Sequence, residues 1–111
     1  MSAAFFSADY EEARQRFLDA AAKAGAAVQH HVHPAKGASG EEIATDTALF
    51  GPADAAKLFI VSSGTHGPEG FAGSACQLSL LNDELARRAA DRGIALLLIH
   101  AVNPYGFSHL K

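Results

Sequence analysis

The chain has 111 residues, of which 49% are hydrophobic, and this composition fits one globular domain with its own core. The formal net charge of -3 and the lack of any basic run longer than Arg87-Arg88 exclude the electrostatic footprint of a nucleic-acid or membrane-surface binder. Cys76 is the single cysteine and has no internal disulfide partner, which favours a cytoplasmic location. The longest apolar run, Ile94–Ile99, is too short to span a bilayer. Composition gives no indication of the oligomeric state.

The first half of the chain predicts one helix and two strands. Asp9 stands at the start of a segment in which apolar residues recur at helical spacing, so we expect a helix over residues 9–24. Alternating apolar residues predict a strand over 26–33, ending at Pro34, and a second strand over 43–50.

The second half predicts a strand, a helix and a strand. An unbroken apolar run over 57–61 is typical of a central strand that is covered on both faces of a parallel sheet. Residues 71–90 predict one helix of about twenty residues, and 94–101 predict a strand parallel to the first through a right-handed crossover. The fold class is therefore α/β with helices on both sheet faces. Because the chain stops soon after this strand, we expect residues 1–111 to be the N-terminal portion of a single, truncated domain.

The loop over residues 62–70 carries the strongest candidate for chemistry. It joins the carboxyl end of a strand to a helix, which is where open α/β sheets bind ligands. His66 offers an imidazole nitrogen and Glu69 a carboxylate oxygen, and both suit Zn²⁺. Spacing alone leaves a simpler alternative, in which Glu69 favours the helix N-terminus electrostatically and His66 is a solvated loop residue.

A longer match gives this loop more weight. Residues 64–74, Gly-Thr-His-Gly-Pro-Glu-Gly-Phe-Ala-Gly-Ser, resemble the zinc loop of the zinc carboxypeptidase and succinylglutamate desuccinylase/aspartoacylase superfamily. More narrowly, the chain is similar to a bacterial branch of uncharacterised carboxypeptidase-like proteins. That branch has a Thr-Asp strand, a Gly-Pro turn and a His-Ala-x-Asn-Pro-Tyr-Gly-Phe ending, matched here by residues 45–46, 51–52 and 100–107. Pro68 stands where the family carries an aliphatic residue such as valine.

The resemblance implies roles for three residues. His66 and Glu69 correspond to the first two zinc ligands, and Asn103 belongs to a turn near the substrate cleft, so we predict it to be substrate-binding. It also implies a mixed sheet of the zinc-carboxypeptidase-like (phosphorylase/hydrolase-like) type, Zn²⁺ as the cofactor, and a small peptide or N-acyl amino acid as the substrate. The family's third ligand, its substrate-binding arginine and its general base have no matching position in residues 1–111. No catalytic residue is therefore assigned, and the chain alone is expected to be inactive.

Other histidines are weaker candidates. His31 and His33 share one strand face and could chelate a metal, but exposed strand histidines are usually solvated. His109 lies outside the family's pattern. His100 either faces the cleft or satisfies a hydrogen bond at the sheet edge.

The sequence thus predicts a zinc-dependent metallohydrolase, with carboxypeptidase-like or N-acyl amino acid deacylase-like amide hydrolysis in the complete protein. The alternative is a non-catalytic truncated remnant that acts as a binding or interaction domain. We also expect an unpaired sheet edge with exposed apolar side chains, and therefore self-association, at Phe59, Ile60, Leu97 and Ile99.

Overall fold

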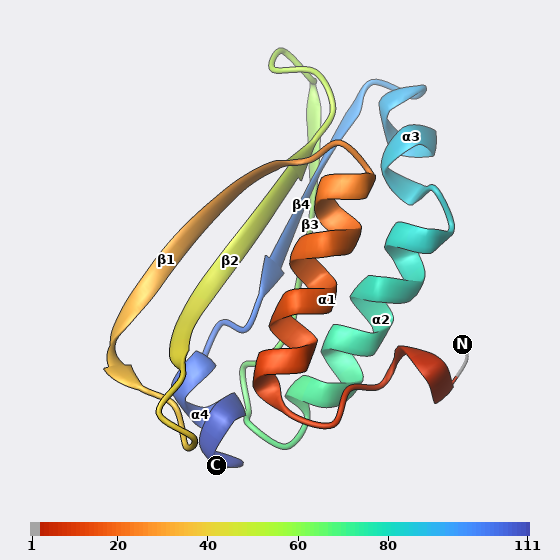
Figure 1. The fold of residues 1–111 in the computed structure, drawn as a ribbon. Coiled ribbons are helices and arrows are strands. Elements are labelled where there is room, and N and C mark those ends of the chain that lie inside the picture. The colour runs from red at the N-terminus through yellow and green to blue at the C-terminus, as the bar shows by residue number, and fades with distance from the viewer. Residues whose placement is uncertain (1–2) are drawn as a thin grey trace.

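The structure is a computed structural model that describes residues 3–111. Its centre is a four-stranded mixed sheet with helices packed against it (Figure 1). None of the described helices is both long and apolar enough to cross a membrane. In chain order the elements are a 3₁₀ helix (Ala3–Phe5), α1 (Tyr10–Lys23), β1 (Ala27–Lys36), β2 (Glu42–Phe50), β3 (Lys57–Ser62), α2 (Gly70–Asn82), α3 (Leu85–Ala90), β4 (Ile94–His100) and α4 (Pro104–His109).

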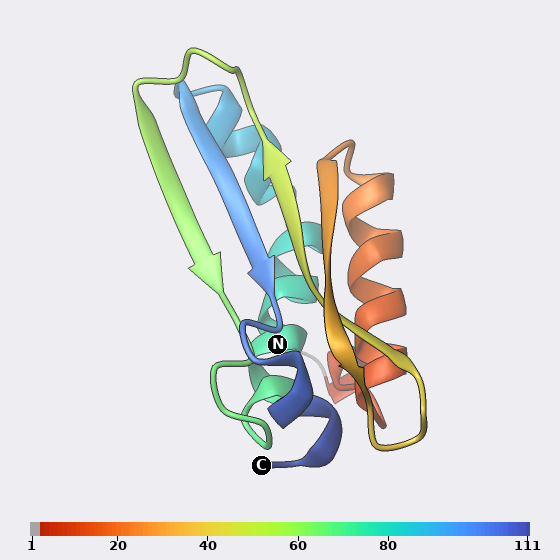
Figure 2. The ribbon, with the colours of Figure 1, turned by 90° about the vertical axis from the view of Figure 1, so that its left-hand side faces the viewer.

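The strand order β1-β2-β4-β3 places the last strand in the interior of the sheet. Strand β4 pairs antiparallel with β2 and parallel with β3, while β1 pairs antiparallel with β2. The two parallel strands therefore end at the same edge, where the segments that follow them meet (Figure 2). The expected mixed α/β architecture and the parallel pairing of the two apolar strands are confirmed.

Helices α1 and α2 lie side by side on one face of the sheet (Figure 1). Helix α1 begins where the sequence predicts, because the Asp9 side chain accepts a hydrogen bond from the Glu12 amide and caps the first turn. Its apolar side packs on the sheet through Phe17, against Leu96 and Leu98 of β4. The α/β fold class is confirmed, and among residues 3–111 the helices α1, α2 and α3 lie on this face of the sheet (Figure 2).

The prediction that residues 57–61 form a central strand is wrong. Within residues 3–111 strand β3 has one neighbour, β4, and it forms an edge of the sheet. Leu58, Phe59 and Ile60 are each about half exposed. The apolar run identifies a strand suited to burial, but it does not say which strand of the pair is interior; β4 takes that position because it also pairs with β2.

The single helix expected over 71–90 is two helices. Helix α2 ends at Asn82, and Glu84 adopts a left-handed conformation with φ 58° before α3 begins. Asn and Asp side chains compete with the helix backbone for hydrogen bonds, which accounts for a break at this point.

Two further differences concern prolines. Strand β1 continues past Pro34 to Lys36, because β1 is an edge strand and its ladder is already irregular between Val32 and Lys36. Residues 104–109 form a short helix, where the sequence analysis expected only a turn. Its signal was present: Asn103 is a strong N-cap residue and Pro104 suits the first helical position.

Candidate metal-binding site

The loop between β3 and α2 lies at the carboxyl edge of the parallel pair (Figure 2). Its first residue, Ser63, donates its amide hydrogen to the Ile99 carbonyl oxygen at 2.9 Å, which fastens the loop to the end of β4. Gly64 then turns the chain with φ 73°, a conformation that glycine adopts without strain. The loop is thus placed where ligands bind in open α/β sheets.

Both predicted ligands are exposed on this loop. The side chains of His66 and Glu69 form no hydrogen bond or ion pair with any described residue. Glu69 occupies the N-cap position of α2, yet its side chain makes no capping hydrogen bond. Glu69 thus lies at the helix N-terminus, as the simpler electrostatic alternative requires, and both donor side chains are also free for a ligand.

The donor set fits part of a zinc site. An imidazole nitrogen and a carboxylate oxygen are two of the three protein ligands typical of a catalytic zinc centre. Within residues 3–111, no group of three or more His, Cys, Asp or Glu side chains is arranged to hold a metal.

The other histidines considered are engaged elsewhere. The ring of His109 stacks on Tyr105 with centroids 4.1 Å apart, and its Nε2 lies 3.4 Å from the Lys36 carbonyl oxygen. His33 accepts a hydrogen bond from the Ala35 amide through Nδ1. Neither belongs to a metal-binding group among the described residues.

Helix α4 packs directly against the loop. The backbone amide of Asn103 donates to the Gly64 carbonyl oxygen at 2.8 Å, and the backbone amide of Gly67 donates to the Lys111 carbonyl oxygen at 3.0 Å. A Cβ added to Gly67 would collide with the Gly106 carbonyl oxygen, so only glycine permits this approach. The side chain of Asn103, predicted to be substrate-binding, contacts Gly106 and Thr65, and its role toward a substrate stays a prediction.

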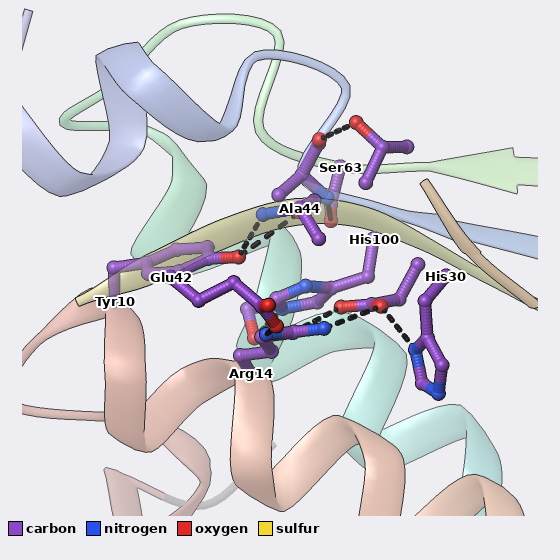
Figure 3. A network of polar contacts seen from close by, with 11 residues as sticks. Tyr10, Arg14, His30, Glu42, Ala44, Ser63 and His100 are labelled. Carbon is purple, nitrogen blue, oxygen red and sulfur yellow. Dashed lines mark hydrogen bonds and ion pairs between the residues drawn. The ribbon is translucent and has the colours of Figure 1, made fainter. Parts of the chain in front are cut away.

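Beneath the loop lies a buried polar network that the sequence analysis did not identify (Figure 3). Asp46 is fully buried and accepts two hydrogen bonds from the Arg14 guanidinium, at 2.8 and 3.2 Å. His30 reaches the same carboxylate, with Nδ1 2.7 Å from Oδ1. Tyr10 closes the network by donating from its hydroxyl to the Ala44 carbonyl oxygen, and burial raises its pKa to about 12.

His100 is buried at the end of β4, next to this network. Its Nε2 lies 2.9 Å from the Ser74 hydroxyl, its ring stacks on Phe17, and its Nδ1 has no partner among the described residues. Burial lowers its pKa to about 4. Of the two roles considered for His100, the structure supports the hydrogen-bonded one, because the ring is fully buried and contacts Ser74 of α2 and Phe17 of α1.

Gln77 of α2 fastens the two parallel strands to each other. Its Nε2 donates to the carbonyl oxygens of Val61 and Ile99, both at 3.0 Å, and its Oε1 accepts from the Ser63 hydroxyl at 2.9 Å. In the sequence, the signal for this role is a glutamine among the apolar positions of the predicted helix. In the structure Gln77 is fully buried.

A groove of about 590 Å³ lies between α1 and the α2–α3 segment, away from the loop. It is lined by both charged and apolar side chains, among them Arg16, Lys23, Leu81 and Arg87. None of its lining residues belongs to the β3–α2 loop, so this groove is not part of the candidate site.

Comparison with known proteins gives one family and a set of similar folds. A family model described as "Protein of unknown function (DUF2817)" matches residues 6–111. No curated protein matches the chain. A Zn-dependent exopeptidase from Parabacteroides distasonis has a TM-score of 0.58 at 16% identity, over 95% of this chain and 42% of that chain.

Two glutaminyl cyclases have similar folds. The enzyme from Tannerella forsythia has a TM-score of 0.56 at 14% identity, over 91% of this chain and 41% of that chain. The Porphyromonas gingivalis enzyme has a TM-score of 0.56 at 16% identity, over 92% and 50%. The chain thus spans half or less of the length of these structures, and the likeness establishes a fold of the Zn-dependent exopeptidase type.

Proposed function

We propose that this chain, which belongs to the DUF2817 family, forms the N-terminal part of a zinc-dependent metallohydrolase and supplies two of its metal ligands, His66 and Glu69. The observation that carries the proposal is the placement of two unengaged donor side chains on a glycine-rich loop at the carboxyl edge of a parallel strand pair. The metallohydrolase-like fold supports it.

The two proposed ligands would supply different donor atoms. His66 offers a neutral nitrogen and Glu69 an anionic oxygen, and a third ligand would come from outside residues 3–111. A bound zinc ion supplies Lewis-acid polarisation of an amide carbonyl and lowers the pKa of a coordinated water. The proposed reaction is carboxypeptidase-like cleavage of a small peptide, or deacylation of an N-acyl amino acid.

The test is a zinc competition titration against a chromophoric chelator, on residues 1–111 and on the protein in its full length. We expect weak binding by the short chain and tight binding by the longer one. His66→Ala and Glu69→Ala should each weaken the tight binding strongly. His31→Ala serves as the matched control, because His31 is an exposed histidine on β1 and its loss should leave zinc affinity unchanged.

Two results would argue against the proposal. Tight, His66-dependent binding by residues 1–111 would mean that a third ligand is already present. Unaltered zinc binding after His66→Ala in the full-length protein would show that His66 is not a zinc ligand. It would favour the alternative, a non-catalytic binding or interaction domain.

A further inference from the structure

We propose that Asn103 is a positioning residue for the metal loop, which it holds in shape together with helix α4. The inference rests on the proposed function, since it assigns a role toward His66. It is a role in addition to the substrate-binding one that the family resemblance implies for Asn103.

Both the oxygen and the nitrogen of the Asn103 side chain make a hydrogen bond. Its Oδ1 accepts a hydrogen bond from the Gly106 amide at 2.9 Å, which caps the first turn of α4. Its Nδ2 donates to the Thr65 carbonyl oxygen at 3.4 Å. The two partners fix the orientation of the amide, because one partner is a donor and the other an acceptor. These two contacts tie the loop at Thr65 to the first turn of α4 through one side chain.

Both sequence neighbours of His66 are tied to the same segment. Thr65 is bound by the Asn103 side chain, and Gly67 donates its amide hydrogen to the Lys111 carbonyl oxygen at 3.0 Å. The Lys111 amide in turn donates to the Gly106 carbonyl oxygen at 2.9 Å. The backbone of His66 is thus held on either side, while its side chain stays exposed. Such an arrangement orients a ligand before the metal arrives.

Helix α4 is itself anchored in the core, so it can serve as a fixed support. Phe107 is fully buried, and its ring lies 5.3 Å from Tyr10 and 4.8 Å from Phe71. A Cβ at Gly70 would lie 2.5 Å from the Phe107 ring, which shows how closely the helix supports the end of the loop. Ala101, which directly follows β4, has φ 63°, an uncommon conformation for alanine.

Ala101 is held by strand β2 and by the start of the β3–α2 loop. The Thr45 hydroxyl donates to the Ala101 carbonyl oxygen at 2.7 Å, and the Ala101 amide donates to the Ser63 hydroxyl at 3.3 Å. The strained residue therefore lies between β4 and α4 with both of its backbone groups bound. These contacts set the direction in which the chain leaves β4 and reaches Asn103.

The experiment compares three variants of the full-length protein. Asn103→Ala removes both side-chain contacts. Asn103→Asp keeps the acceptor for the Gly106 amide but has no donor for Thr65. Asn82→Ala is the matched control, because Asn82 is an exposed asparagine at the end of α2. For each variant we would measure zinc affinity by chelator competition, and hydrogen exchange in peptides that cover residues 64–70 and 104–109.

We expect Asn103→Ala to lower zinc affinity roughly 10- to 100-fold, the range for groups that orient metal ligands, and to speed exchange in both segments. Asn103→Asp should protect residues 104–109 again but leave the loop exchange fast and the zinc affinity low. Asn82→Ala should match the unsubstituted protein. Thermal unfolding midpoints would show that each variant is folded.

Two outcomes would overturn the inference. Wild-type zinc affinity and loop exchange in Asn103→Ala would show that Asn103 does not position the loop. Full recovery of zinc affinity in Asn103→Asp would show that the contact with Thr65 has no role. The proposed function is tested separately by His66→Ala: if that variant binds zinc normally the metal site fails, while the hydrogen exchange still reports on the loop.

Discussion

Asp46 and His100 are direct partners in the antiparallel pairing of β2 with β4, and both side chains are completely buried. Their environments differ. Asp46 is paired with the Arg14 guanidinium and approached by His30, whereas His100 has one hydroxyl contact and a nitrogen without a partner among the described residues. Asp46 is therefore buried as part of an ion pair, and His100 is buried as an uncharged ring. Each of the two environments predicts a different effect on stability.

Acid is expected to destabilise the protein through His100. Burial lowers the pKa of His100 from 6.5 to about 4, with Asp46 opposing this shift and Arg14 adding to it. In the unfolded chain the ring takes up a proton near pH 6.5, but in the folded protein only near pH 4. The unfolded state therefore binds more protons between these values, and stability falls as the pH is lowered through this window. At about 1.4 kcal/mol per pKa unit, the loss reaches roughly 3 kcal/mol.

Denaturant unfolding at several pH values between 4 and 7 measures this dependence. His100→Gln should flatten it, because the titrating group is gone. The same substitution at exposed His31 should leave it unchanged. A dependence that survives in His100→Gln would assign the acid sensitivity to other groups.

Removing the Asp46 carboxylate should be strongly destabilising. Desolvation alone lowers the pKa of Arg14, but hydrogen bonds to Asp46 and Glu42 raise it overall, and the Arg14 side chain is only 15% exposed. Asp46→Ala leaves this charge without its buried partner, at an expected cost of about 3–5 kcal/mol. Glu42→Ala removes the other partner, which is 53% exposed, and should have little effect. Urea unfolding of both variants makes the comparison, and equal losses would contradict it.

Gln77 should be a second buried polar group that the fold requires. In Gln77→Leu the carbonyl oxygens of Val61 and Ile99 lose a donor and the Ser63 hydroxyl loses an acceptor. We expect a loss of about 2–3 kcal/mol in the free energy of unfolding, because buried polar groups are left unpaired. Ser79→Ala, on the same helix, is the control and should unfold at nearly the same urea concentration. A gain in stability for Gln77→Leu would show that apolar packing outweighs these hydrogen bonds.

The exposed edge strand is expected to cause self-association of residues 1–111. Leu58, Phe59 and Ile60 are each more than half exposed on β3, whose outer edge has no strand neighbour among the described residues. Ile60→Lys should shift the chain toward a monomer in analytical ultracentrifugation, because a charge on an edge strand opposes pairing. Leu110→Lys changes another exposed apolar residue, the C-cap of α4, and should not. A monodisperse unsubstituted monomer would contradict the prediction.

The sequence predicted those features that depend on nearby residues. Helix α1 is confirmed because its N-cap contact joins Asp9 to Glu12, three residues away. All four strands were found because each is an apolar or alternating run between turn residues. The break at Glu84 and the short helix after Asn103 were missed, although both carry local signals that a closer analysis of capping residues could use.

Features that depend on distant residues were not predictable from the pattern. Arg14 meets Asp46 across 32 positions of the chain, and no spacing rule identifies such a pair. The exposure of β3 follows from the strand order, which periodicity does not encode. His66 and Glu69 lie on one exposed loop, and their role as zinc ligands stays a prediction.

The strand order has a consequence for how the protein is made. Strand β4 pairs with both β2 and β3, yet it is synthesised after them. Until residues 94–100 have left the ribosome, β2 and β3 have no common neighbour, and assembly is restricted to the β1–β2 hairpin with the helices α1 and α2. Closure of the sheet is therefore one late step, in which β4 inserts between two strands that already exist. During synthesis the edge of β2 that later pairs with β4 has no strand partner until that step takes place.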